Sequence, residues 1–144
     1  MTIQYCQSFL LEQLTGTHDF SSDTIKLALF DVNASFDQDT TTYSTANELA
    51  NGTGYTTGGA TMALASGYPK IENGFGAVRF ATPAATWTFT AIKNPTWALM
   101  YNASKSNRAI MSIFFSNRSA FGDFSITFPL SLDPIITAKA PMVV

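Results

Sequence analysis

A two-residue alternation of apolar and polar side chains runs through the second half of the chain and limits the folds open to it. In residues 86–92, Trp87, Phe89 and Ala91 alternate with threonines. Similar patterns occur at 25–30, 77–80, 97–101, 109–115 and 124–130, with turn-forming residues between them. Successive side chains of a strand point to opposite faces of a sheet, so this period is typical of strands. The spacing of roughly ten residues predicts an all-β fold, an antiparallel β-sandwich or a jelly-roll-like barrel.

A different period near the start predicts a short N-terminal α-helix at residues 3–15. Its apolar residues are separated by threes and fours and are expected to share one buried face: Ile3, Cys6, Phe9, Leu10 and Leu14. Thr2 is placed to cap the start, and Gly16 to end the helix in a left-handed conformation. Cys6 is then expected to be a small core residue rather than a reactive thiol.

The composition fits one domain, residues 1–144, with an extended C-terminal tail at 133–144. Hydrophobic residues make up 46% of the 144 residues and charged residues only 12%, about half of the ~25% of an average soluble domain. A net charge of −2 provides no basic surface for nucleic acid or an anionic membrane. No segment approaches the ~18–20 apolar residues of a membrane helix. No Lys or Arg precedes Lys26, so we expect no signal peptide and synthesis in the cytoplasm.

One cysteine and one histidine restrict the chemistry of the chain. A single Cys6 excludes an internal disulfide and multi-cysteine zinc sites, and a single His18 excludes two-histidine metal motifs. A triad of His18 with Asp19 or Asp23 lacks a Gly-x-Ser-x-Gly segment to present a nucleophile. We therefore expect no catalytic, cofactor-binding or metal site, and no enzyme activity. A small hydrolase that uses His18 and Asp19 is the competing hypothesis.

Three local patterns resemble ligand sites. Four glycines at 52–59 resemble a phosphate loop, but no lysine and no strong helix pattern follow them. Asp37 and Asp39 lack the third oxygen ligand, the glycine and the closing glutamate of a calcium loop, which favours solvated loop carboxylates. Tyr55, Trp87 and Trp97 could line a carbohydrate platform, but core packing is the favoured interpretation.

Two motifs within residues 22–62 are the most distinctive part of the sequence. Ser22–Phe30, preceded by Ser21, has the form Ser-Asp-Thr-hydrophobic-Lys-hydrophobic-Ala-hydrophobic-Phe, and Asn51–Gly59 reads Asn-Gly-x-Gly-Tyr-Thr-x-Gly-Gly. Together with the strand at 97–101 and the apolar strand after it, these motifs resemble a family of small virion proteins of tailed bacteriophages. The resemblance covers about two-thirds of the chain. Residues 121–144 depart from it.

The resemblance implies a non-enzymatic structural protein of a phage particle. The reading it favours is a capsid cement (decoration) protein that stabilises the head, a homotrimer whose partners are its own copies and a major virion protein such as the capsid protein. Neither nucleic acid nor a membrane is an expected partner. The alternative is a tail, collar or adhesion component that binds a glycan through Trp or Tyr side chains. In either case the expected location is the virion.

Three projecting segments are the expected contact sites. The first is the polar loop with Asp37 and Asp39, and the second is the hairpin with Lys105 and Arg108. The third is the apolar end of the tail, with Met142 and Val143. Apolar side chains of this kind can stay exposed when a neighbouring chain covers them.

Overall fold

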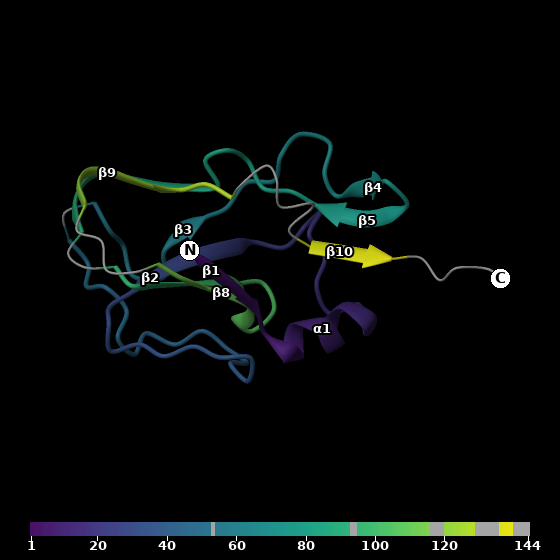
Figure 1. The fold of residues 1–144 in the computed structure, drawn as a ribbon, viewed down its shortest axis with the longest axis horizontal. Coiled ribbons are helices and arrows are strands. Elements are labelled where there is room, and N and C mark those ends of the chain that lie inside the picture. The colour runs from purple at the N-terminus through teal and green to yellow at the C-terminus, as the bar shows by residue number, and fades with distance from the viewer. Residues whose placement is uncertain (53, 93–94, 116–119, 129–135, 140–144) are drawn as a thin grey trace.

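The fold is mainly β, as the alternating pattern predicts. The computed structural model describes residues 1–52, 54–92, 95–115, 120–128 and 136–139, which form ten strands and one helix (Figure 1). In chain order these are β1 (Thr2–Tyr5), α1 (Gln7–Leu14), β2 (Ile25–Phe30), β3 (Ala60–Thr61), β4 (Lys70–Glu72), β5 (Phe75–Val78), β6 (Ala85–Ile92), β7 (Trp97–Asn102), β8 (Arg108–Phe114), β9 (Ala120–Ile126) and β10 (Ile136–Lys139).

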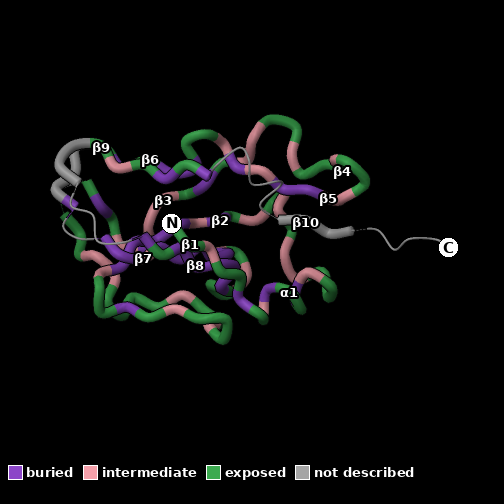
Figure 2. The backbone as a smooth tube through the Cα atoms, in the orientation of Figure 1, coloured by how far each residue is buried: buried purple, intermediate pink, exposed green. Residues whose placement is uncertain are grey.

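A five-stranded antiparallel sheet forms the centre of the molecule. Its strand order is β1-β8-β7-β2-β3. The central strands are buried on both faces, and Leu27, Leu99 and Ile113 are fully inaccessible to solvent. Figure 2 shows this burial as purple along the middle of the sheet. Because both faces are covered, these strands read as nearly continuous apolar runs and not as a strict alternation.

Two different segments cover the faces of this sheet. The segment after β2 packs Phe36 against Phe30, with ring centroids 4.8 Å apart, and stacks Tyr43 on Tyr101 at 4.2 Å. Figure 1 shows that segment on one side of the sheet and the β6–β9 pair on the other. Such layering is compatible with the expected sandwich.

The N-terminal helix is shorter than the predicted span 3–15. Ile3 lies in β1, opposite Ile113 of β8, and the helix begins only at Gln7. Thr2 therefore does not cap the helix; Cys6 occupies the N-cap position without a side-chain bond. Residues 2–5 pair with the edge of β8 instead of extending the helix. The Cys6 N–H continues this pairing by donating to the Ile110 carbonyl at 3.0 Å.

Two expectations at the same helix are confirmed. Gly16 follows the C-cap residue Thr15 and has φ +71°, the left-handed conformation expected there. Cys6 is fully buried, and burial, followed by the nearby charges of Asp37 and Glu12, raises the pKa of its thiol to about 11. The burial of Cys6 agrees with its expected place as a small core residue.

Part of the expected C-terminal tail belongs to a sheet. β10 pairs antiparallel with β5, so that Ile136 lies opposite Val78, in a three-stranded sheet of order β10-β5-β4. Other strand boundaries differ from the predicted ones by a few residues; the strand predicted at 77–80 is Phe75–Val78. Pro129 and Leu130, predicted to end the strand from 124, lie outside the described residues, as do Met142 and Val143.

Gly59 is required where the glycine-rich segment meets the sheet. Its φ is +73°, and a Cβ atom there would lie 2.0 Å from the Leu27 carbonyl oxygen. Gly67 has a similar φ of +82°, but a Cβ atom there would meet nothing within 4 Å. The two positions share the backbone strain and differ only in the space available.

We therefore predict that Gly59→Ala destabilises the protein much more than Gly67→Ala. The Gly67 variant should lose about 1 kcal/mol from backbone strain alone. The Gly59 variant should lose ~3 kcal/mol or more, because the clash with backbone is added to the strain. Urea unfolding of both variants measures the difference. Equal losses would contradict the close approach of Gly59 to β2.

Candidate functional site

A buried polar cluster lies beneath α1. His18 Nε2 is 2.8 Å from Glu12 Oε2, and His18 Nδ1 is 3.0 Å from the side-chain nitrogen of Asn102. The His18 side chain is 1% exposed and that of Glu12 11%. Buried polar groups of this kind are stable only when their hydrogen bonds are satisfied.

The hydrogen bonds of Asn102 assign the tautomer of His18. The Asn102 side-chain oxygen accepts the Ser104 N–H at 3.0 Å, so its NH₂ group donates to Asp23 Oδ2 at 2.7 Å and to His18 Nδ1. Nδ1 is then an acceptor, and the proton on Nε2 is donated to Glu12. Both ring nitrogens are engaged within the protein, so neither is available to act as a general base in this arrangement.

The carboxylate that contacts His18 is not one that the sequence singled out. The triad hypothesis paired His18 with Asp19 or Asp23, whereas its carboxylate partner is Glu12. Asp19 instead accepts hydrogen bonds from Ser21 and Ser22, which lower the pKa of its carboxyl group. Nothing in the spacing of Glu12 and His18 could have revealed their contact, because it forms across the end of α1.

Two of the expected contact residues serve this cluster. Arg108 Nη1 lies 2.9 Å from Glu12 Oε1, and Lys105 Nζ lies 3.6 Å from Asp23 Oδ1. Both cations compensate carboxylates that are mostly buried, yet their own side chains are 45% and 41% exposed. They therefore have an internal role whether or not a partner also contacts them.

Asp37 and Asp39 lie in an exposed turn beside the start of α1. The Asp39 N–H donates to Asp37 Oδ1 at 2.9 Å, and the Gln7 N–H at the beginning of α1 donates to the Gln38 carbonyl at 2.8 Å. The turn is thus fixed to the helix, with its carboxylates facing solvent. Met142 and Val143, the remaining expected contact residues, lie outside the described residues.

A second cluster holds the glycine-rich motif against the sheet. Glu48 Oε1 accepts the Tyr55 hydroxyl at 2.7 Å and the Gly58 N–H at 2.6 Å, and Glu48 Oε2 accepts the Tyr43 hydroxyl. The Tyr55 oxygen in turn accepts the Leu29 N–H at 2.9 Å. The amide of Gly58, which a phosphate loop would direct at its ligand, is thus bonded to a carboxylate of the same chain.

The pKa values of Tyr43 and Tyr55 lie above the ordinary value of a tyrosine hydroxyl. Burial raises the pKa of Tyr43 and Tyr55, and the Glu48 carboxylate raises both further. Burial also raises the pKa of Tyr101 to about 12. A tyrosine whose pKa is higher in the folded state than in the unfolded state, where it is ~10, contributes its full stabilisation below that pH. The contribution is lost as the pH rises from the unfolded-state pKa toward the folded-state pKa.

We predict that the free energy of unfolding is insensitive to these tyrosines below about pH 9 and falls above about pH 10. Glu48→Gln should cost about 2–4 kcal/mol at neutral pH, because an amide replaces an acceptor of three hydrogen bonds. Tyrosinate formation, followed by ultraviolet absorbance of the folded protein, should shift to lower pH in this variant.

The matched control is Glu72→Gln, which also removes a carboxylate bonded to a tyrosine. Glu72 Oε2 accepts the Tyr68 hydroxyl at 2.9 Å at the surface. That variant should leave the alkaline titration of the buried tyrosines unchanged. The same titration in wild type and Glu48→Gln would contradict the role of Glu48.

The helix α1 directs a carboxylate inward and leucines outward. Phe9 is fully buried and Glu12 is 8% exposed, whereas Leu10, Leu11 and Leu14 are 50%, 63% and 86% exposed. We call these three residues the leucine face. The expectation that Leu10 and Leu14 are buried is therefore wrong, because the hydrogen bonds of Glu12 to His18 and Arg108 orient the helix the other way.

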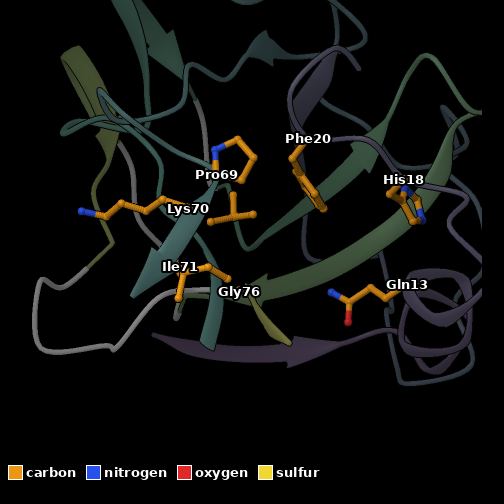
Figure 3. A pocket seen from close by; sticks show the side chains of 9 residues that line it. Gln13, His18, Phe20, Pro69, Lys70, Ile71 and Gly76 are labelled. Atoms are coloured by element: carbon orange, nitrogen blue, oxygen red, sulfur yellow. The ribbon is translucent and has the colours of Figure 1, made fainter. Parts of the chain in front are cut away.

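A cavity of about 410 Å³ opens beside α1 (Figure 3). One wall comes from the end of α1 and the connection to β2, with Gln13 and His18. The opposite wall comes from β4 and β5, and its lining is mostly apolar: Pro69, Ile71, Ala77 and Val78. Phe20 lies between the two walls in Figure 3. We call this cavity the α1 pocket.

The aromatic residues considered for a carbohydrate platform do not form one. Tyr55 and Trp87 are 4% and 5% exposed, and their rings pack together 6.1 Å apart in the core. Trp97 is half-buried against Phe114. Core packing, the favoured interpretation of these residues, is confirmed for Tyr55 and Trp87.

Comparison of the chain with protein-family models, curated proteins and solved structures finds no match. Within the part of the chain that the structure describes, no helix is long and apolar enough to cross a membrane. The described residues also contain no group of three or more His, Cys, Asp or Glu side chains placed to hold a metal ion. The leucine face and the α1 pocket are two apolar features on the surface of the described residues.

Proposed function

We propose that this chain is a non-enzymatic structural protein of a bacteriophage particle, a capsid cement protein that stabilises the head through protein–protein contacts. The motifs at 22–30 and 51–59 support the kind of particle through their resemblance to small virion proteins. The leucine face supports the contact role, since three strongly exposed leucines on one short helix are typical of a surface that a neighbour covers.

The polar clusters favour a structural role over a catalytic one. His18 uses both ring nitrogens within the chain, and Glu48 accepts three internal hydrogen bonds. Their hydrogen bonds fasten α1 and the glycine-rich motif to the sheet. A surface with few charged residues also costs less to desolvate when chains associate.

The alternative of a tail, collar or adhesion component shares the contact role. Its glycan-binding form requires exposed aromatic rings, and burial of Tyr55 and Trp87 removes two of the three rings considered for that purpose. We therefore favour the cement role over a glycan-binding component of the tail or collar.

We predict that phage particles without this protein release their genome at a lower temperature than complete particles. The double variant Leu11→Lys/Leu14→Lys should reproduce this loss, because it places two charges on the leucine face. Genome release on heating, followed with a DNA-binding dye, measures the effect. Cryo-electron microscopy of complete particles should show the protein on the outer surface of the head.

The matched control is Val32→Lys, the same kind of change at a residue that is 68% exposed and lies outside α1. Particles with this variant should resist heat as wild type does. Equal heat resistance with and without the protein contradicts the cement role. Density at the tail or collar supports the alternative instead.

A further inference from the structure

We propose that the leucine face of one copy occupies the α1 pocket of a second copy of this chain. The inference rests on the proposed function and extends it, because it names the two surfaces through which copies of this chain contact each other.

The leucine face and the α1 pocket are complementary in chemistry. The first is convex and apolar, with exposures between 50% and 86%. The second is hollow and mostly apolar, and its volume of about 410 Å³ lies within the ~300–1,000 Å³ typical of protein binding pockets. Burying the leucines in such a cavity removes apolar surface from water on both chains.

The two surfaces adjoin one another on the same molecule. Gln13 lines the α1 pocket, and on an α-helix it lies ~60° around the axis from Leu10. Each copy can therefore offer leucines to one neighbour and a pocket to the same or another neighbour. Such a contact closes as a two-fold pair or as a ring, of which the expected trimer is an example.

Exposed charges of opposite sign lie at the start of α1 and at the α1 pocket: Asp37 and Asp39 beside the helix, and Lys70 in the pocket lining. The turn with Asp37 and Asp39 is fixed to the first residue of α1 by the bond from Gln7 to Gln38. At the pocket, the ammonium group of Lys70 points away from the cavity (Figure 3). It lies 4.6 Å from the centre of the Tyr68 ring. In the contact that we propose, the carboxylates of one copy and Lys70 of the other lie at the rim, where opposite signs favour association.

Ile71 allows the pocket to be changed without disturbing the core. It lines the α1 pocket but is 76% exposed. Ile71→Asp should therefore weaken the contact and leave the fold intact, as should Leu11→Lys/Leu14→Lys on the other surface. Circular dichroism and thermal unfolding of both variants check the fold.

The first experiment measures the mass of the purified chain in solution by analytical ultracentrifugation. Wild type and Val32→Lys should sediment as a multiple of the 15.6 kDa chain, and each of the two surface variants as a single chain. A wild-type chain that stays single at high concentration overturns the inference.

The second experiment mixes the two variants. The Ile71→Asp copy keeps its leucine face and the Leu11→Lys/Leu14→Lys copy keeps its pocket, so one intact contact can form only between unlike copies. We expect the mixture to associate although neither variant does so alone. A mixture that remains single chains overturns the proposed pairing of these surfaces.

A charge reversal tests the same contact independently. Lys70→Glu should weaken association by ~10-fold, and adding Asp37→Lys should restore most of it. Failure of the second change to restore association contradicts the placement of these charges at one rim. A chain that is single in solution yet present on particles overturns this inference alone, whereas absence from particles overturns the proposed function.

Discussion

The outer edge of β2 is the constraint on which the rest of this fold depends. Only Lys26 and Leu27 of that strand have partners in β3, so the other backbone groups of this mostly buried strand need different partners. The Tyr55 hydroxyl accepts the Leu29 N–H, and the Leu49 N–H donates to the Leu29 carbonyl. The glycine-rich motif is therefore best understood as the completion of a sheet. Its glycines permit close approach, and its tyrosine supplies a hydrogen-bond acceptor that the neighbouring backbone does not.

On α1 a carboxylate is buried and leucines are exposed, which is the reverse of an ordinary surface helix. Glu12 points inward because His18 and Arg108 supply its partners there. Once this carboxylate is fixed, the period of the helix sends Leu10, Leu11 and Leu14 outward. The leucine face thus follows from hydrogen bonds on the opposite side of the same helix, and a change in the buried cluster should alter the surface that neighbours meet.

The strands could be predicted from the sequence because their information is local. Residues 25–30 and 97–101 carry their pattern within a few positions, and the structure places strands there. The start of the helix could not be predicted, because Ile3 joins β1 only when Ile113 is beside it, far along the chain. The same holds for the site: His18 meets Asn102 across 84 positions. The α1 pocket was missed because its walls come from segments that no sequence pattern connects.

Blocking one margin of a β-sheet also limits how such a molecule can polymerise. The segment around Glu48 and Tyr55 occupies the side of β2 beyond its short pairing with β3, while β1 ends the sheet on the opposite side. Strand-by-strand growth into a fibril requires two open sheet edges on every molecule, so that each molecule can pair with a neighbour on both sides. A sheet with one open edge can pair with one other such sheet, and growth through that sheet then stops. The glycine-rich motif thereby limits strand-by-strand growth at this edge of the five-stranded sheet.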